Sequence, residues 1–465
     1  MAAGAATAAA LPRAKAEGFP FIQKVRAASD QVPYAFIGTG SRGQYLLKHM
    51  KETDVGRCVG LCDNWDQNLK KGLDTLGQKV PAYLDYRELL ARKDVEAVYI
   101  ATPLYMHFPI TRDALQAGKH VFCEKSLVHK PEEVHLLRAL YQQHQNKQVL
   151  QVGLQRHYSL FYDAAKEMVA KGMLGNVTHV RGQWHRNSSQ RKALPKGAPP
   201  NGELDRKINW RMYKEYAGGN TAELASHQID VADRMFGSHP EFVVGVGGID
   251  TFKDGRDVFD NIQLIYSYPG GRKLIYTSIS TNSHLDLLQS QRQEFGEIIM
   301  GTAGTIEITI GDDNHPATAL WYREPAPVVA ALTKADEKKK EETKAGATMT
   351  TAAATRGVPL LLPRDMLGKA DSFLSREAKF ARRWLYSKGI MVPEENRNPV
   401  TVSLEDFLLC CKNPAGKKPK ADMEVGLRDS TAVILSNLAM EEGRRVYFNE
   451  IDKFKPGAAP AGKKG

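Results

Sequence analysis

The sequence lacks any apolar stretch long enough to cross a membrane. No run of about 18 apolar residues occurs in the written chain, so nothing in it is expected to span a bilayer. The five cysteines are odd in number and follow neither a zinc-ligand spacing nor a disulfide framework. With 42% apolar and 25% charged residues, the chain is neither collagen-like nor wholly disordered. We expect a globular protein, and its 465 residues indicate two or three domains.

The formal charge of +11 does not point to nucleic acid, because of where the excess lies. Residues 412–420 contain four lysines and no acid, and the tail at 453–465 contains four more lysines and no acid. These charges occupy a Gly/Pro-rich loop and a terminus rather than one folded face. We therefore predict a basic periphery and no nucleic-acid partner.

Residues 1–32 are Ala-rich at their start and resemble part of an export leader. Ala14-Lys15-Ala16 has the small-x-small form of a signal-peptidase site, although no charged or twin-Arg start precedes it. This predicts a periplasmic or otherwise exported protein. A disordered end on a cytoplasmic protein is the alternative.

From Pro33 onward, short apolar runs alternate with helix-like segments. We expect strands at 34–37, 58–62, 97–101, 120–123 and 148–153, and helices at 43–51, 65–76, 85–92, 107–118 and 131–145. Near-continuous apolar strands are typical of a parallel sheet that is covered on both faces. The prediction is an α/β fold whose first domain, residues 33–155, is a doubly wound parallel sheet.

Residues 156–452 predict a second domain with a largely antiparallel sheet. The alternation over 258–281 reverses at Pro269-Gly270-Gly271-Arg272, which indicates a hairpin. Further strand-like segments lie at 177–186, 240–248 and 296–310. Residues 325–370 contain few large apolar side chains, so we expect a surface insertion or flexible segment there.

A glycine-rich loop follows the first strand and opens a helix. Gly38, Gly40 and Gly43 form a Gly-x-Gly-x-x-Gly pattern around Ser41 and Arg42. The glycines allow a tight turn and close approach of the backbone to a pyrophosphate, which the helix N-terminus can bind. This pattern predicts a dinucleotide site.

Asp63 strengthens that prediction, because it ends the second strand twenty residues after the last glycine of the loop. A carboxylate there accepts hydrogen bonds from an adenosine ribose and repels a 2′-phosphate. Asn64 and Trp65 supply no cation, so NAD is preferred over NADP, although Arg42 and Lys70 lie near enough in sequence to leave NADP open.

Several further motifs occur in a fixed order, and they are Ala101-Thr102-Pro103 with His107, Ala117-Gly118-Lys119-His120-Val121, and Glu124-Lys125-Ser126. With the glycine loop, this set resembles the Gfo/Idh/MocA oxidoreductases, the family of glucose-fructose oxidoreductase and inositol dehydrogenase. The likeness continues at Gly218-Gly219, Glu223, His227, Asp230 and 426–446, so it covers roughly residues 33–450.

The resemblance implies a Rossmann domain, a C-terminal α/β domain on an open sheet whose face often makes dimers or tetramers, and a nicotinamide cofactor. It implies sugars, polyols or their derivatives as substrates. Cofactor contacts are implied for Thr102, Pro103, His107, Glu124, Lys125 and Gln155. The family's usual Glu-Lys-Pro reads Glu-Lys-Ser here, so the sequence gives no basis for a cis peptide at this position.

Lys125 is the candidate base for oxidation of a secondary alcohol, which must lose its hydroxyl proton as the hydride leaves. It lies just past the C-terminal end of a predicted strand, where open α/β sheets bind ligands. Burial beside a cofactor would lower its pKa toward neutrality.

Glu223 and His227 are four residues apart in a segment, 219–236, whose apolar spacing predicts a helix. His227 can then exchange a proton with the substrate hydroxyl while Glu223 orients the ring or binds another hydroxyl. The family commonly has Asp at the position of Glu223. The spacing of the pair also fits half of a zinc site, but no further ligands are spaced to complete it, so we predict no metal.

Two segments are candidates for the substrate wall. Residues 155–158 follow the last strand of the first sheet, and residues 209–213 precede the Gly218-Gly219 helix start. From these, the predicted substrate contacts are Arg156, Tyr158, Trp210, Arg211 and Tyr213.

The sequence therefore predicts an NAD-dependent oxidoreductase acting on the CH–OH group of a sugar, polyol or sugar derivative. One alternative is an NAD-dependent glycosidase that oxidises its sugar transiently, eliminates the aglycone and returns the hydride. Another is a noncatalytic nucleotide-binding sensor. A homo-oligomer, either a dimer or a tetramer, is expected from the family resemblance.

Overall fold

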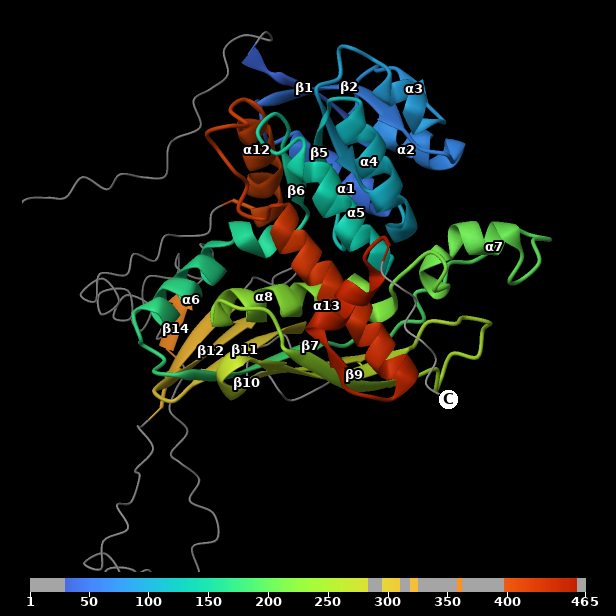
Figure 1. Ribbon diagram of the computed structural model, residues 1–465. Helices are drawn as coiled ribbons and strands as arrows, with labels where there is room; N and C mark the ends of the chain where they lie inside the picture. The colour runs from blue at the N-terminus through green and yellow to red at the C-terminus, as the bar shows by residue number, and fades with distance from the viewer. Residues whose placement is uncertain (1–29, 283–294, 310–317, 325–357, 362–396, 458–465) are drawn as a thin grey trace, which may run out of the picture.

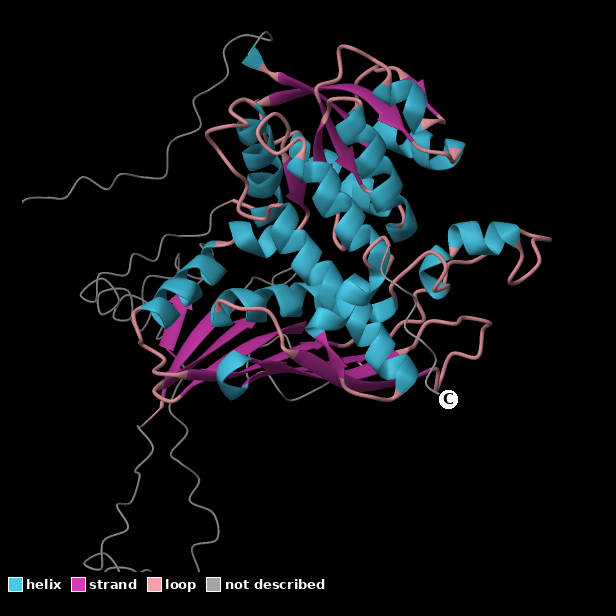
Figure 2. Cartoon of the chain, viewed as in Figure 1, coloured by secondary structure: helices cyan, strands magenta, loops and turns pink. Residues whose placement is uncertain are grey.

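The computed structural model describes residues 30–282, 295–309, 318–324, 358–361 and 397–457. These residues form two sheets, each with its own helices. The C-terminal ends of the strands of the first sheet face the helices of the second domain (Figure 1). Figure 2 shows helices gathered between the two sheets, where they separate one from the other.

The first sheet has six parallel strands in the order β3-β2-β1-β4-β5-β6. They are β1 (Val32–Ile37), β2 (Gly56–Cys62), β3 (Ala82–Tyr83), β4 (Ala97–Ile100), β5 (His120–Cys123) and β6 (Leu150–Val152). The helices between them are α1 (Ser41–Met50), α2 (Asp66–Leu76), α3 (Tyr86–Leu90), α4 (His107–Gln116) and α5 (Pro131–Gln142). The predicted doubly wound Rossmann sheet is confirmed. The two residues of β3 are too few to give a sequence pattern.

Helix α12 (Pro399–Cys411) also packs on this first sheet, although it lies far along the chain. The Tyr99 hydroxyl donates to the carbonyl oxygen of Leu404 at 2.9 Å, and the rings of Tyr99 and Phe407 meet edge-on, 5.2 Å apart. The assignment of all of 156–452 to the second domain therefore needs correction for α12, because its apolar face is buried against the Rossmann core.

The second sheet has nine strands in the order β14-β13-β12-β11-β7-β10-β9-β8-β15. They are β7 (Val177–Trp184), β8 (Phe242–Gly248), β9 (Asn261–Tyr268), β10 (Arg272–Ile279), β11 (Phe295–Gly301), β12 (Gly304–Thr309), β13 (Thr318–Arg323), β14 (Val358–Leu361) and β15 (Val446–Tyr447). Adjacent strands are antiparallel except β7 and β10. The predicted hairpin is β9 and β10, whose inward positions are buried.

The strand predicted at 296–310 is in fact the pair β11 and β12. Thr302 and Ala303 leave the ladder, because their N–H groups donate to the carbonyl oxygens of Asn176 and Leu174. The chain reverses there, and β12 returns antiparallel to β11. A single apolar run therefore contained a turn that its composition did not reveal.

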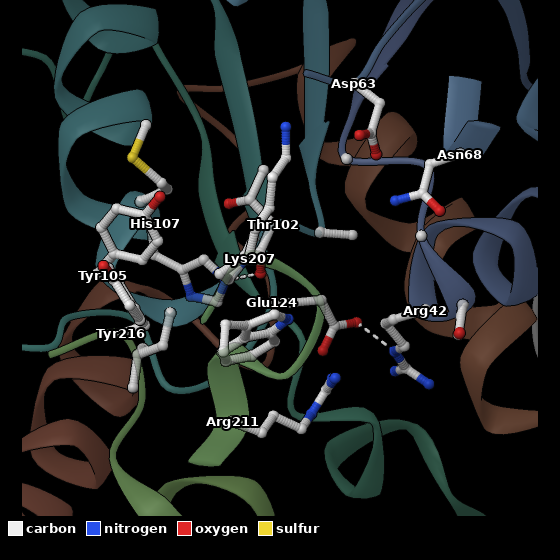
Figure 3. Close-up of a pocket in the computed structure, with 18 of the residues that line it drawn as sticks. Arg42, Asp63, Asn68, Thr102, Tyr105, His107, Glu124, Lys207, Arg211 and Tyr216 are labelled. Atoms are coloured by element: carbon white, nitrogen blue, oxygen red, sulfur yellow. Dashed lines mark hydrogen bonds and ion pairs between the residues drawn. The ribbon is translucent and has the colours of Figure 1, made fainter. Parts of the chain in front are cut away.

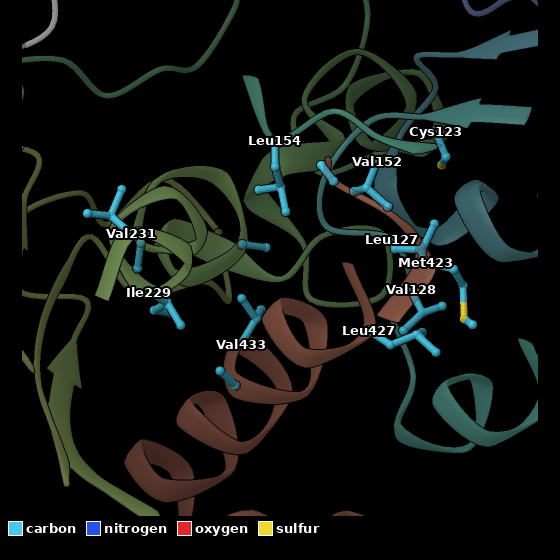
Figure 4. Close-up of a cluster of buried hydrophobic side chains, with 14 of the residues drawn as sticks. Cys123, Leu127, Val128, Val152, Leu154, Ile229, Val231, Met423, Leu427 and Val433 are labelled. Carbon is cyan, nitrogen blue, oxygen red and sulfur yellow. The ribbon is translucent and has the colours of Figure 1, made fainter. Parts of the chain in front are cut away.

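The helices of the second domain cover one face of its sheet. They are α6 (Leu160–Ala170), α8 (Ser226–Phe236) and α13 (Met423–Glu442), with the π-helical turn η5 (Thr221–Ala225) directly before α8. Helix α7 (Glu203–Ile208) projects to one side of the sheet (Figure 1). The short 3-10 turns are η2 (Leu104–Met106) in the first domain, η3 (Gln155–Tyr158), η4 (Trp210–Met212), η6 (Pro269–Gly271) between β9 and β10, and η7 (Phe448–Phe454). Figure 4 shows α13 between the two domains, with Leu427 near Leu127 and Val433 near Ile229. Helix α13 thus links both cores.

Other predicted segments lie partly outside the described residues. The leader-like residues 1–16 fall outside them, as does most of 325–370, of which β14 is described as a strand paired with β13. In the basic loop, Lys417 pairs with Asp406 at 2.6 Å and Lys420 with Asp163 at 3.0 Å. Every helix within the described ranges is too short or too polar to span a lipid bilayer.

Candidate active site

A cavity of about 840 Å³ lies at the C-terminal ends of the Rossmann strands, and residues of the second domain line its other side. The strand order reverses here around β1, which is where open α/β sheets bind ligands. Figure 3 shows Asp63 and Asn68 at one end of the cavity and His107, Tyr105 and Tyr216 at the other.

The glycine loop forms one wall of this cavity. Gly38 has a φ of +95°, and a Cβ added to it would lie 2.6 Å from the carbonyl carbon and oxygen of Ala101. A Cβ on Gly40 would meet only Asn68 Nδ2, at 3.6 Å. The first turn of α1 carries no acid, so its N–H groups can face an anion. The predicted loop residues that line the cavity are Gly38, Gly40, Ser41 and Arg42.

Gly43 is placed differently from the rest of the motif. A Cβ at Gly43 would lie 2.1 Å from the carbonyl oxygen of Gly38, so the residue lets α1 pack tightly on the loop. It is absent from the cavity wall. Its predicted cofactor contact is therefore replaced by a packing role.

Asp63 lies in the cavity wall at the end of β2. Its Oδ2 accepts a hydrogen bond from the Thr39 N–H at 2.8 Å, and its Oδ1 accepts one from the Trp65 N–H at 2.9 Å. Burial raises the pKa of this carboxyl, and these hydrogen bonds oppose the rise. The Thr39 hydroxyl also donates to Oδ2, at 3.4 Å. The carboxylate still has acceptor capacity left for a ribose hydroxyl.

Of the two cations that the sequence suggested near the adenosine ribose, Arg42 lines the cavity and Lys70 does not. Lys70 lies on α2 outside the cavity wall, whereas Lys207, at the end of α7, reaches across from the second domain. Its Nζ donates to the carbonyl oxygen of Asn64 at 3.1 Å. Arg42 is held by Glu124, with Nε and Oε1 2.9 Å apart. Lys207 was missed because nothing in sequence connects α7 to β2.

Glu124 is buried over the end of β6, where Gly153 leaves room for it. A Cβ on Gly153 would lie 2.9 Å from Oε2 of Glu124. The carboxylate lines the cavity and pairs with Arg42, as Figure 3 shows. Glu124 therefore orients Arg42 beside the glycine loop.

His107 joins two loops of the cavity wall. Its Nδ1 lies 2.7 Å from the carbonyl oxygen of Ser126, and its Nε2 lies 3.0 Å from that of Thr102. Burial lowers the pKa of His107 despite these two carbonyls. Thr102, Pro103 and His107 all line the cavity. A neutral His107 ring has a single N–H, so it donates to one of these two carbonyl oxygens at a time.

Lys125 lies in the cavity wall immediately after β5. Its Nζ donates to the carbonyl oxygens of Ala222 at 2.9 Å and Glu223 at 2.5 Å. Burial lowers its pKa to about 8, although Glu223 and other nearby carboxylates oppose the change. The peptide between Lys125 and Ser126 is cis. A lysine of this kind is a usable base near neutrality.

The carbonyls that bind Lys125 belong to a π-helical turn. The sequence predicted one helix over 219–236, but residues 221–225 form the π-helix η5 and α8 begins at Ser226. The Ser226 hydroxyl donates to the carbonyl oxygen of Ala222 at 2.9 Å, so that oxygen serves two partners. Single π-turns often occur at functional sites, and propensity alone does not reveal them.

Glu223 projects from η5 into the cavity and is paired with Arg211, whose Nε is 2.7 Å from Oε2. Burial alone would raise the pKa of Glu223, but Arg211 and Lys125 outweigh it and hold the pKa below its ordinary value. Glu223 is thus an anion between two cations. It can accept a hydrogen bond from a ligand hydroxyl.

His227, at the start of α8, also lines the cavity. Its ring stacks on Trp184, with centroids 5.7 Å apart and planes inclined by 27°. Burial lowers its pKa well below the ordinary value, and nearby cations, first Lys125 and then Arg156, add to the effect. Its Nδ1 is buried and has no hydrogen-bond partner among the described residues. His227 is therefore a neutral imidazole with a nitrogen available to a ligand.

Aromatic side chains complete the cavity on the side of the second domain. Trp184 and Trp210 line it, and the Arg211 guanidinium lies over the Trp210 ring, 4.2 Å from the centroid. Tyr105 and Tyr216 lie together with centroids 5.0 Å apart. Trp210 and Arg211 were predicted, whereas the other three were missed. Trp184 lies in a predicted strand, but a strand's alternation does not say which face meets the cofactor domain.

Three predicted substrate residues lie elsewhere. Arg156 is buried and forms an ion pair with Glu297 of β11, because the 3-10 turn η3 directs it into the second domain. Tyr158 is buried, and its hydroxyl accepts from the N–H of Lys420 at 3.2 Å. Tyr213 is buried, and its hydroxyl donates to Asn201 at 3.1 Å. Of the 155–158 segment, the cavity wall contains Gln155.

Unpaired polar atoms in the wall fit a polar cofactor. Thr102 Oγ1, Gln155 Oε1 and His227 Nδ1 are buried and lack hydrogen-bond partners within the described part of the chain, yet all three residues line the cavity. Buried polar groups are ordinarily satisfied, so a ligand is expected to complete them. No three His, Cys, Asp or Glu side chains among the residues described are grouped to hold a metal ion.

Two family models match the chain in succession. The first, described as the oxidoreductase family with an NAD-binding Rossmann fold, matches residues 32–154. The second, the GFO/IDH/MocA C-terminal domain, matches residues 162–307. The chain belongs to the Gfo/Idh/MocA family. The predicted family and its NAD-binding domain are thereby confirmed.

Several named proteins are similar to this chain over part of its length. It is 26% identical over 284 residues to 2,7-anhydro-N-acetylneuraminate hydratase of Mediterraneibacter gnavus, covering 60% of this chain and 68% of that protein. It is 31% identical over 209 residues to levoglucosan dehydrogenase of Pseudarthrobacter phenanthrenivorans, covering 40% of this chain and 50% of that protein. A solved structure of levoglucosan dehydrogenase with NADH and levoglucosan has a TM-score of 0.61 at 18% identity, covering 90% of this chain and 99% of that one.

Proposed function

We propose that this Gfo/Idh/MocA protein transfers hydride between NAD and a secondary hydroxyl of a sugar, polyol or sugar derivative. The observation that carries the proposal is the meeting of Lys125 from the first domain with Glu223 and His227 from the second, in one cavity with the glycine loop. NAD, when bound, supplies the hydride acceptor. The rest of the reaction requires a proton acceptor and a site that holds the hydroxyl.

Lys125 is the proton acceptor in this proposal. Its amine loses its proton near pH 8, so it is partly neutral at physiological pH and can take the hydroxyl proton as the carbonyl forms. The carbonyl oxygens of Ala222 and Glu223 hold its Nζ in place. A lysine on a free side chain would stay protonated and could not act in this way.

His227 and Glu223 hold and polarise the reacting hydroxyl. His227 is neutral, so it can exchange a hydrogen bond or a proton with the hydroxyl without adding charge to a site that already contains Lys125. Glu223 is kept ionised by Arg211 and can accept from a neighbouring hydroxyl. Vicinal hydroxyls, as in a sugar or polyol, suit this pair.

The aromatic residues Trp184 and Trp210 support a sugar ring as substrate. Flat aromatic faces with a few hydrogen-bonding groups between them are typical of small-molecule sites that orient a ring. Arg211 lies over one face of Trp210 and His227 over one face of Trp184, so each aromatic ring has a hydrogen-bonding group next to it. The relative named levoglucosan dehydrogenase supports the same substrate class.

The first experiment is mass spectrometry of the cofactor and any ligand that co-purify with the protein, followed by a sugar and polyol screen read as NADH absorbance. The proposal expects NAD in the preparation and NADH formation with at least one compound. A preparation that binds NAD but leaves the whole panel unoxidised would support the alternative of a noncatalytic nucleotide-binding sensor.

A second candidate function is transient oxidation without net redox change, as in an NAD-dependent glycosidase. The relative named as a hydratase supports this second candidate, since the addition of water to a substrate involves no net oxidation or reduction. An aryl glycoside separates the two: aglycone release with catalytic NAD and no NADH accumulation supports the second function. NADH in proportion to sugar consumed supports the dehydrogenase.

We also propose that the protein is a homo-oligomer that uses the face of the second sheet away from α8 and α13. Val246 of β8 and Ile265 of β9 are 65% and 44% exposed there and lie on the same side of the sheet. Light scattering after size exclusion tests this, with Val246→Lys expected to shift the population toward monomer.

We propose, finally, that the protein is exported, supported by Ala14-Lys15-Ala16 in the leader-like segment. Fractionation of cells that make the full chain tests this. The exported protein should start after residue 16 and lie outside the cytoplasm, whereas an intact N-terminus in the cytoplasm contradicts export.

A further inference from the structure

The second domain lines the cavity with more cations than acids. Its acids there are Glu203 and Glu223, whereas its cations are Arg186, Lys192, Arg206, Lys207 and Arg211. The glycine loop and Arg42 of the first domain are placed on the opposite wall, where they can hold the pyrophosphate of NAD. The positive charge of the second domain therefore suits a further anion, such as a charged group on the substrate.

Lys192 is a cation of this wall without an anionic partner. Its Nζ makes no hydrogen bond or ion pair with any residue that the structure describes, although the side chain lines the cavity. Partial burial lowers the pKa of Lys192, and the positive charges of Arg211 and Lys71 add to the effect. An ammonium in this position is stabilised by an anion that comes from outside the chain.

Arg211 has donors left on the same side of the cavity. Its Nε is used by Glu223, at 2.7 Å from Oε2, while its two terminal Nη groups make no hydrogen bond within the described ranges. The guanidinium lies over the ring of Trp210, which limits its motion. Figure 3 shows the Arg211 side chain pointing into the cavity, apart from Asp63 at the adenosine end. A guanidinium held in this way presents paired N–H donors to a carboxylate.

Asn209 ties the two cations together through the backbone of Lys192. Its Oδ1 accepts a hydrogen bond from the Lys192 N–H at 2.7 Å, and its Nδ2 donates to the Lys192 carbonyl oxygen at 3.0 Å. Asn209 is buried and lies two residues before Arg211. Its side chain therefore fixes the segment of Lys192 against the turn that carries Arg211.

The fully buried carboxylate of Asp205 anchors both segments. It accepts from Nδ2 of Asn209 at 2.7 Å and forms an ion pair with Arg191, the residue next to Lys192. It also accepts from the Asn201 N–H at 2.7 Å. Buried and satisfied polar networks hold backbone segments in one arrangement. The backbones that present Lys192 and Arg211 to the cavity are thus placed by the fold, unlike those of two lysines in a surface loop.

We propose that Lys192 and Arg211 form a subsite for a carboxylate carried by the substrate, so that the substrate is a sugar acid such as a uronate. This refinement rests on the function proposed above, in which Glu223 and His227 hold hydroxyls of the same molecule. Binding of the carboxylate itself does not depend on turnover. A carboxylate suits the subsite better than a phosphate, because Glu223 neutralises part of the positive charge and repels a dianion more strongly than a monoanion.

Calorimetric titration in the presence of NADH measures the binding of sugar acids apart from their oxidation. The probes are D-glucuronate, D-galacturonate and D-mannuronate, each compared with its parent aldose and with the 6-phosphate of that aldose. We expect at least one uronate to bind about tenfold more tightly than both of its counterparts. A panel in which no uronate binds, or in which the aldose or the phosphate always binds better, would overturn the proposal.

Lys192→Met removes the charge and keeps an apolar stem, so the preference for the uronate over its aldose should fall by about tenfold. Lys192→Arg keeps the charge and should retain most of the preference. Lys196→Met is the matched control, because Lys196 is an exposed lysine four residues further on and lies outside the cavity wall. It should leave the preference as in the wild type.

A uronate preference that survives Lys192→Met, or an equal loss in Lys196→Met, would overturn the proposal. A loss of NADH affinity in Lys192→Met as large as the loss of uronate affinity would also overturn it, because Lys192 would then belong to the cofactor site. Uronate binding that depends on Lys192 without any oxidation would sustain the subsite and reject the proposed function. Oxidation of neutral sugars with no preference for uronates would do the reverse.

Discussion

The Nζ atom of Lys125 lies 2.5 Å from the carbonyl oxygen of Glu223 and donates a hydrogen bond to it. The lysine ends a strand of the Rossmann domain, while the carbonyl belongs to the π-helical turn of the second domain. The position of the proposed base is therefore set by both domains together. A change in the way the domains meet would move the amine relative to the cofactor.

The first prediction concerns pH. Lys125 must be a neutral amine to accept a proton, so sugar oxidation should speed up as pH rises through about 8 and level off above it. The reverse reaction, reduction of the carbonyl product, takes its proton from the Lys125 ammonium, so its rate should fall over the same pH interval. Initial rates of kcat/KM in both directions, measured across the pH range with saturating cofactor, check this. An oxidation rate that is flat through this window contradicts Lys125 as the base.

The second prediction concerns cofactor choice. Asp63→Asn keeps the hydrogen-bonding shape at the end of β2 but removes the charge that repels a 2′-phosphate, so NADP binding relative to NAD should improve by about tenfold. Calorimetric titration with each cofactor measures the ratio. Asp66→Asn, which removes an exposed charge three residues on, should leave it unchanged. Equal ratios in the two variants would argue that Asp63 does not face the ribose.

The third prediction concerns the contact between Lys207 and Asn64 across the cavity mouth. Lys207→Ala removes a bond between the second domain and the cofactor domain beside the adenosine end. NADH should then dissociate about threefold faster, a small effect because the contact is exposed. Stopped-flow displacement of NADH measures the rate. Lys70→Ala, on α2 outside the cavity, serves as control, and an equal effect there would contradict a specific bridge.

The fourth prediction concerns stability. Arg156 and Glu297 form a buried ion pair in the second domain. Glu297→Gln leaves the guanidinium buried without its counter-charge, which should lower the free energy of unfolding by about 3–5 kcal/mol. Glu424→Gln breaks an exposed pair with Arg138 and should cost no more than about 1 kcal/mol. Urea denaturation of both variants measures the difference, and similar costs would contradict the buried pair.

The Rossmann sheet and the glycine loop were predictable because their signals are local. Apolar runs, glycine positions and Asp63 lie within one stretch of chain, and the cofactor edge follows from strand order. Lys125, Glu223 and His227 were found by motif and spacing. The structure brings all three into one cavity wall.

The rest depends on contacts between distant segments. Helix α12 packs on Tyr99 from the far end of the chain, and Lys207 reaches Asn64 from the other domain. Arg156 was misassigned because a short 3-10 turn decides the direction of each side chain, and sequence does not show it. The role of Trp184 was not predictable for a similar reason, because the strand pattern does not tell which face of the sheet packs against α8 and the cavity.

The most direct test of the account is Lys125→Ala, assayed for hydride transfer and for NAD binding in the same preparation. We predict a loss of about a thousandfold in turnover, with the dissociation constant for NAD changed by less than about threefold. Lys147→Ala, an exposed lysine on the same domain, should behave as the wild type. Turnover of Lys125→Ala within about tenfold of the wild type would contradict the central claim.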